Sequence, residues 1–248
     1  MARLVSLTTL QGRVKQRCNL EVASNAAIYS AAELTDNINE GLSALYSMII
    51  GQQDQPYYLE SSSFTTTANK DTYTIGSGGD INVADFFKLA GIDVAVGQNI
   101  IITAKPFMWS ERNRFKYLSG WIYSQPIFYR LIGKTSAVAQ SGNDSIKFIP
   151  SPSGGFSCTL WYFPTPPVLV AAGDQFDGIN GYEEYIVLHA ARKLLVKQER
   201  MEHAQAVTQM LAEEIDRIRA ELGSHDAENP PRVNDTMLND GWIGRPGY

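Results

Sequence analysis

The chain has 248 residues, of which 44% are hydrophobic and 19% are charged, and its formal net charge is -5. A chain of this length can bury a sizeable core and is close to the size at which one domain divides into two. The negative charge argues against a general nucleic-acid binder, because such proteins neutralise phosphates with an excess of lysine and arginine.

Cysteine content and the hydropathy pattern argue against disulfide-rich, zinc-binding and membrane proteins. Cys18 lies in a helical pattern and Cys158 in a strand pattern, and there are no other cysteines. They support neither a disulfide framework nor a zinc site with paired cysteines, so we expect two small buried residues. The first residues lack a signal-peptide core, and no run of about 18 apolar residues occurs. We therefore expect a protein made in the cytoplasm, without a membrane segment.

Residues 1–55 predict two helices. Leu10, Val14 and Cys18 recur every four residues behind Thr8, which can cap a first helix with Gln11 reaching back to it.

The second helix begins at Ser30, and Glu33 lies three residues later as in a capping box. One apolar face then continues until Gly51, through Leu34, Ile38, Leu42, Leu45 and Ile49.

Residues 56–170 have the composition of β structure and predict a β-rich region inserted between helices. Strands are expected at 57–67, 72–75, 100–102, 117–124, 127–132, 145–149 and 156–163, with a turn at 75–80. The triplet at 100–102 suits a buried strand. A short helix is expected at 83–89 and one or two helical turns at 106–113.

The strand at 156–163 is apolar on both faces. Its two faces carry Phe156, Cys158, Leu160 and Tyr162 on one side and Ser157, Thr159, Trp161 and Phe163 on the other. Isolated sheets usually leave one face in water, so this strand is expected to be sandwiched or covered by a neighbouring subunit.

Residues 171–222 predict one long helix, because apolar residues step by three, four or seven from Tyr182 to Leu222. If the helix is unbroken, about 40 residues at about 1.5 Å each would span roughly 60 Å. Such a helix either bends or serves more than one subunit. The fold class expected is thus α+β: a helical bundle with a long C-terminal helix, the inserted β-rich region, and an extended arm at 223–248.

The arm combines turn-forming residues with apolar ones, which pure linkers seldom carry. We expect it to dock on a partner through a set of residues that comprises Pro230, Pro231, Met237, Leu238, Trp242, Ile243 and Tyr248.

Sequence motifs for catalysis, cofactors or metals are missing. The three histidines, His189, His203 and His225, have neither zinc-protease nor di-iron spacing. The Gly-rich segment at 76–79 is neither a P-loop nor a dinucleotide fingerprint. Glu183 and Glu184 are adjacent, and acidic residues favour a helix N-terminus. We therefore assign no catalytic, cofactor-binding or metal-binding residue.

The most site-like polar cluster is Trp109 with Glu111, Arg112 and Arg114. Tryptophan and arginine dominate protein interfaces, and no nucleophile lies nearby, so we interpret this cluster as an interface. Trp161 and Phe163 on the second face of the strand at 156–163 are further candidates for interface residues.

The chain resembles the bacteriophage head-to-tail adaptors, the neck or connector proteins under the portal. The resemblance lies in the order of several segments: 30–34, 39–46, 71–75, 85–93, 146–152, 160–164, 182–187 and 190–195. The polar stretch at 136–143 is longer than the family pattern.

The resemblance implies a dodecameric ring that joins the portal to the next neck or tail component and leaves a channel for the passing DNA. Its place would be the neck of the virion. The arm would dock on the portal, and the β region would face the next component. Two different complementary faces per subunit suit a head-to-tail ring.

Two other hypotheses remain. A hydrolase or nuclease could draw on distant acids, for instance Glu60, Asp71, Asp80 or Glu111. A tail-tube or baseplate component could use the β-rich middle, although the long C-terminal helix argues against it.

Overall fold

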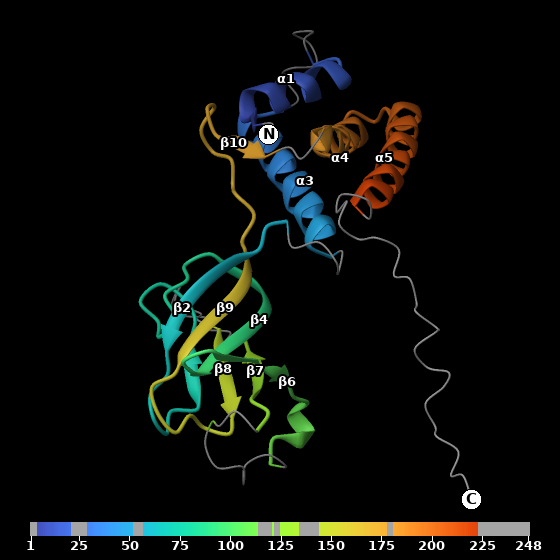
Figure 1. Ribbon diagram of the computed structural model, residues 1–248. Coiled ribbons are helices and arrows are strands. Elements are labelled where there is room, and N and C mark those ends of the chain that lie inside the picture. The colour runs from blue at the N-terminus through green and yellow to red at the C-terminus, as the bar shows by residue number, and fades with distance from the viewer. Residues whose placement is uncertain are drawn as a thin grey trace, which may run out of the picture. The chain divides into compact units, whose positions relative to one another are not determined.

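The computed structural model describes residues 4–20, 29–51, 57–113, 121, 125–133, 144–177 and 181–222 (Figure 1). The chain divides into two compact units: Met1–Gln55 with Leu169–Tyr248, and Pro56–Val168. The first unit is helical and the second is built from strands, which confirms the mixed α+β class.

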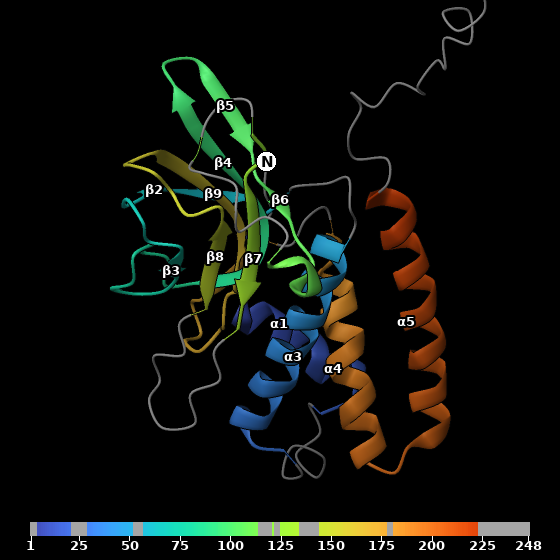
Figure 2. The same ribbon diagram turned by 90° about the horizontal axis from the view of Figure 1, so that it is seen from below.

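The helical unit contains α1 (Leu7–Arg17), α3 (Ala31–Gly51), α4 (Glu183–Lys197) and α5 (Met201–Leu222). Helix α4 packs against α1, α3 and α5 (Figure 2). A short antiparallel ladder joins β1 (Leu4–Ser6) to β10 (Gln175–Asp177). The core is formed by fully buried aliphatic and aromatic side chains, among them Leu10, Ile38, Leu42, Leu45, Tyr182, Ile186 and Leu194.

Both helices predicted in the first 55 residues are present. Helix α3 begins behind Ser30, whose hydroxyl accepts a hydrogen bond from the Glu33 amide at 3.1 Å, as predicted. The cap predicted for the first helix was wrong, because Ser6 caps α1 by accepting from the Thr9 amide. The Thr8 hydroxyl instead donates to Ala172 O.

The single helix predicted from Tyr182 to Leu222 was wrong, because the chain turns back between α4 and α5. Glu199 has φ 60° and occupies the left-handed region. The Glu199 amide donates to Val196 O, and the Arg200 amide donates to Leu195 O. This is the Schellman pattern of a helix C-terminus, in which a glycine usually takes the left-handed position. The apolar periodicity continues across the break between α4 and α5, so the sequence pattern did not predict this break.

Helix α1 ends in the same way. Asn19 has φ 52°, its amide donates to Gln16 O, and the Leu20 amide donates to Lys15 O. Asparagine tolerates this conformation better than most residues, so the end of α1 is less strained than the end of α4.

The β unit contains two four-stranded sheets, ordered β2-β9-β4-β5 and β3-β8-β7-β6. The first comprises β2 (Glu60–Thr65), β9 (Ser157–Pro164), β4 (Phe86–Gly97) and β5 (Ile100–Thr103). The second comprises β3 (Thr72–Thr74), β8 (Ser145–Ile149), β7 (Phe128–Ile132) and β6 (Lys105–Pro106). Only β6 and β7 pair in parallel among these named strands.

One hydrophobic core joins the two sheets. Cys158, Leu160 and Tyr162 of β9 belong to the same buried cluster as Ile146 and Phe148 of β8. This face of β9 is one of the two that the alternation predicted to be apolar, and its residues share a core with the facing sheet, as in a sandwich.

Two expectations for the β unit were wrong. The segment at 83–89 is not a helix, since β4 begins at Phe86 and pairs with β9, where Phe86 lies opposite Pro164. The triplet at 100–102 does form a strand, but Ile100 and Ile101 are exposed because β5 lies at a sheet edge.

The helical turns expected at 106–113 are present as a short 3-10 helix, Trp109–Glu111. Apart from Trp121, the strand expected at 117–124 falls outside the described residues, as does the polar stretch at 136–143.

Candidate interaction surfaces

The two cysteines are buried, as expected, and their thiols are poor nucleophiles. Burial raises the pKa of the Cys18 thiol to about 11 and that of Cys158 to about 12, so both stay protonated near neutral pH. Cys18 Sγ donates to Ala191 O at 3.7 Å, which fits a packing role between α1 and α4.

His189 is half-buried on α4, where it contacts α3. A methyl group added at Gly41 would come within 3.3 Å of both His189 Cβ and His189 Nδ1. Burial, followed by the charges of Lys193 and Arg192, lowers the pKa of the imidazole. This histidine therefore marks a close approach of two helices.

The distant acids considered for hydrolytic chemistry have separate structural partners. Asp71 pairs with Lys147, and Asp80 pairs with Lys70. Glu60 accepts a hydrogen bond from the hydroxyl of Tyr162 at 3.1 Å. Within the part of the chain that the structure describes, no three histidine, cysteine, aspartate or glutamate side chains come together as a metal site would require.

Trp109 and Arg112 do come together, on the surface of the β unit. The guanidinium of Arg112 lies 5.5 Å from the centre of the Trp109 ring, and its Nη1 donates to Trp109 O at 3.1 Å. Trp109 is 47% exposed and Met108 is 69% exposed. We call these three residues the Trp109 surface. Glu111 lies in the same turn, while Arg114 falls outside the described residues.

A pocket of about 340 Å³ adjoins the Trp109 surface. Its lining includes Trp109, Arg112 and the pair of Asp71 and Lys147. Burial raises the pKa of Asp71, but hydrogen bonds from Lys147 and Thr72 outweigh it and hold the pKa below its usual value. The pocket therefore offers an aromatic ring, two cations and one carboxylate, a set suited to a polar side chain from a partner.

Trp161 and Phe163 are less accessible than the Trp109 surface. Trp161 Nε1 donates to Asp93 Oδ2 at 2.7 Å, and this bond holds the indole against the outer face of the sheet. Phe163 is buried, with Lys88 Nζ 5.9 Å from its ring centre. The seven arm residues proposed for docking, from Pro230 to Tyr248, fall outside the described residues.

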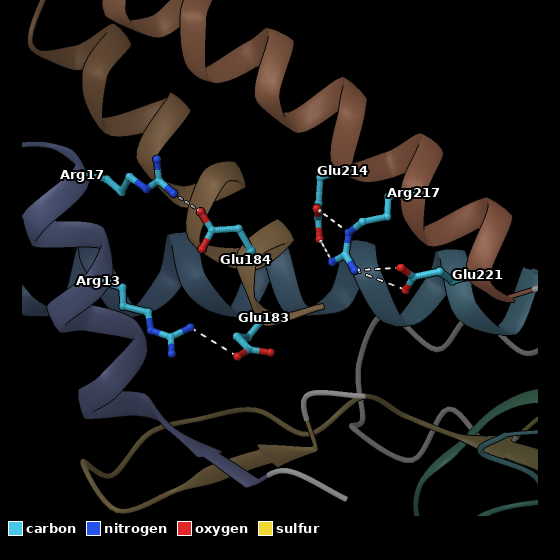
Figure 3. A network of polar contacts seen from close by, with 7 residues as sticks. All are labelled: Arg13, Arg17, Glu183, Glu184, Glu214, Arg217 and Glu221. Atoms are coloured by element: carbon cyan, nitrogen blue, oxygen red, sulfur yellow. Dashed lines mark hydrogen bonds and ion pairs between the residues drawn. The ribbon is translucent and has the colours of Figure 1, made fainter. Parts of the chain in front are cut away.

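Glu183 and Glu184 belong to the packing of the helical unit (Figure 3). Arg13 and Arg17 extend from α1 to the start of α4, where Arg13 Nη1 lies 3.3 Å from Glu183 Oε1 and Arg17 pairs with Glu184. Both carboxylates also lie where the α4 dipole favours negative charge, in the first turn.

On α5, Arg217 lies between two carboxylates of its own helix, Glu214 and Glu221 (Figure 3). Its guanidinium also lies 5.6 Å from the centre of the Tyr182 ring, at the start of α4. The ion pairs of Figure 3 thus connect α1 to α4, and the contact between Arg217 and Tyr182 connects α5 to the start of α4.

Sequence reasoning missed several exposed apolar side chains. On the helical unit these are Leu4, Val170, Val196, Met201 and Met210; on the β unit they include Tyr57, Phe87, Ile100, Ile101 and Val168. Periodicity identifies faces of helices and strands, and most of these residues lie singly in loops or at the ends of elements. Exposed apolar side chains that gather in patches mark contact sites.

Comparison with known proteins agrees with a role in assembly. No curated protein matches the sequence. No helix of the described part has the length and apolar character needed to cross a membrane. Residues 5–234 match the family described as SU10 adaptor protein, which confirms the resemblance to bacteriophage head-to-tail adaptors. The chain therefore belongs to the SU10 adaptor protein family of bacteriophage structural adaptors.

Proposed function

We propose that the chain is a head-to-tail adaptor that forms a dodecameric ring below the portal in the neck of the virion. The ring joins the portal to the next neck or tail component and continues the channel through which the DNA is ejected. A ring subunit contacts its two neighbours and one partner at each end of the ring, so it needs several separate contact surfaces.

The observation that carries this proposal is the division into two units, each with its own core and its own exposed apolar residues. The helical unit exposes Val170 and Met201, and the β unit exposes Met108 and Trp109. Single exposed hydrophobic residues are common, but rigid apolar groups on two separately folded units suit a protein with several binding partners.

In this proposal the helical unit, the β unit and the arm each bind a different partner. The helical unit forms the ring and the Trp109 surface of the β unit contacts the next neck or tail component. The arm at 223–248 binds the portal through its apolar residues, with Trp242 and Ile243 at the centre of the contact.

Net charge supports the passage of DNA. A chain with a formal charge of -5 repels the phosphate backbone when many copies surround a channel, so DNA can move through without specific binding.

Cryo-EM of virions tests the proposal directly. We expect ring density for this chain between the portal and the tail; absence of the chain from the neck would overturn the adaptor role. The same map would show whether the copy number matches that of the portal.

Variants test which part of the chain binds each partner. Deleting 229–248 should leave a folded chain that no longer binds the portal, whereas changing Trp109 to Ala should preserve portal binding and lose the downstream component. Changing Met210 to Ala, an exposed apolar residue of α5, is the control and should leave both contacts intact. Portal binding by the truncated chain would refute the role of the arm.

A further inference from the structure

The loop at 169–174, which we call the Val170 loop, is held by an unusual number of hydrogen bonds. The Asn39 side chain of α3 accepts from the Leu169 amide and donates to Leu169 O, both at 2.9 Å. Asp174 Oδ2 accepts from the amides of Val170 at 2.7 Å and Ala171 at 2.8 Å. The backbone conformation of the loop is thus fixed from both of its ends.

Helix α1 fixes the same loop from a second direction. The Thr8 hydroxyl donates to Ala172 O at 2.8 Å, and the Leu7 amide donates to Asp174 O at 2.9 Å. The bond from Leu7 also satisfies one of the backbone amides that have no partner within the first turn of α1.

The Val170 loop nevertheless presents apolar side chains to solvent. Val170 is 77% exposed, and Ala171 and Ala172 are exposed beside it. A rigid apolar projection loses little conformational entropy when it binds, so it is prepared for a contact that this isolated chain does not make.

The other side of such a contact is available on the same unit, between α4 and α5. A groove of about 540 Å³ is lined by Val196, Met201, Ala204 and Thr208, with Arg192 and Lys193 along one side. Val196 is 47% exposed and Met201 is 55% exposed. We call this surface the α4–α5 groove. Lys193 pairs with Glu40 of α3.

We propose that the Val170 loop of one copy inserts into the α4–α5 groove of the next copy. Val170 and the two alanines would contact Val196 and Met201, and the carboxylate of Asp174 would lie near Arg192. The loop is apolar with one negative charge at its base, and the groove is apolar with positive charge on its side, so the two surfaces are complementary in polarity and charge.

A contact between a loop and a groove also suits the proposed ring. Loop and groove are different surfaces, so each copy uses its loop on one neighbour and its groove on the other. Such a heterologous contact gives a ring where the rotation between neighbours closes and an open filament where it does not, while a contact of one surface with itself would stop at a dimer. This inference rests on the proposed function, and it identifies the surfaces that join neighbouring subunits.

Cysteine cross-linking in virions tests the contact. Phage lacking the native gene would be complemented with a chain that carries V170C and V196C, and treated with a short thiol-specific bifunctional reagent. We expect a ladder of covalent oligomers. Cys18 and Cys158 are buried, so the single variants V170C and V196C should give no ladder.

Mixing the two single variants sharpens the test. Virions containing both V170C chains and V196C chains should give cross-linked dimers without higher oligomers, because each chain then has one reactive position. A cross-link within one chain, which changes mobility without doubling the mass, would overturn the proposal.

Other occupants of the groove are separate outcomes. A cross-link from V196C to I243C in place of V170C would show that the arm fills the groove, and a cross-link from V170C to a different protein would assign the loop to that partner. Either result overturns the proposal. Virions that contain the chain but show no cross-link overturn this inference alone, whereas absence of the wild-type chain from virions overturns the proposed function and the inference with it.

Discussion

Asn39 and Leu169, which are 130 residues apart in the sequence, form a two-way amide contact in which each residue donates one hydrogen bond to the other. Asn39 projects from the middle of α3, and Leu169 is the first residue of the chain after it leaves the β unit. Leu169 is itself buried. The contact therefore fixes the point at which the returning chain rejoins the helical unit.

Changing Asn39 to Ala should destabilise the attachment of Leu169 to α3. Two neutral hydrogen bonds, each worth about 1 kcal/mol, are lost, so we expect a loss of about 2 kcal/mol in the free energy of unfolding. Urea unfolding followed by circular dichroism measures it, and amide exchange should show Leu169 less protected. Changing Asn37 to Ala, the same substitution two residues earlier on α3, is the control for helix propensity and should have little effect. Equal losses from both variants would contradict the prediction.

Two glycines in helices should respond in opposite ways to alanine. At Gly12 of α1 an added Cβ meets no atom within 4 Å, so Gly12 to Ala should stabilise the protein by up to about 1 kcal/mol through helix propensity. At Gly41 of α3 the added Cβ meets His189 and Ile186 O at 3.3 Å. There the steric cost of about 1–3 kcal/mol should exceed the gain. Thermal unfolding compares the two variants, and a higher Tm for Gly41 to Ala would show that α3 and α4 can separate without cost.

The turn between α4 and α5 carries strain that glycine should relieve. Glu199 has φ 60° at the position where glycine is preferred, so Glu199 to Gly should raise the free energy of unfolding by about 1 kcal/mol. Glu213 to Gly, on the exposed side of α5, is the matched control and should lower it by about 1 kcal/mol. The two variants remove the same side chain, so opposite signs in urea unfolding would isolate the backbone effect. A destabilised Glu199 to Gly variant would contradict the assignment of strain.

Periodicity predicted much of the fold. The apolar spacing and the Ser30 cap located α3, and the alternation placed Cys158, Leu160 and Tyr162 on one apolar face of β9, which lies in the core. These signals work because they are local and repeated. The break at Glu199 was not predictable, because its hydrogen bonds need no glycine or proline to form and the apolar steps continue on both sides of it.

The candidate surfaces were predicted only in part. Tryptophan and arginine close together in the sequence drew attention to Trp109 and Arg112, which do lie together. The Val170 loop was missed, since its rigidity comes from Asn39 and Thr8, two polar residues far away in the sequence whose partners only the folded chain shows. Long-range hydrogen bonds to backbone atoms produce no periodic pattern in the sequence, so sequence analysis does not detect them.

Asp174 should make the Val170 loop sensitive to acid. Hydrogen bonds from the Val170 amide and then from the Ala171 amide lower the pKa of this carboxyl. A carboxyl with a lowered pKa in the folded state stabilises that state fully above its unfolded pKa, and the contribution is lost as the pH falls through the folded pKa. The loop should therefore keep its conformation at neutral pH and loosen below about pH 4.

NMR titration measures this loosening. The amide resonances of Val170 and Ala171 should shift together, with a midpoint below the usual pKa of an aspartate, about 3.9. In the Asp174 to Asn variant these shifts should disappear, since the neutral amide does not titrate. The Asp36 to Asn variant, on an exposed part of α3, is the control and should leave the titration of both amides unchanged. If the amides titrated equally in the Asp174 to Asn variant, another acid would hold the loop, and the contact proposed between Asp174 and Arg192 of the next copy would lose its preformed carboxylate.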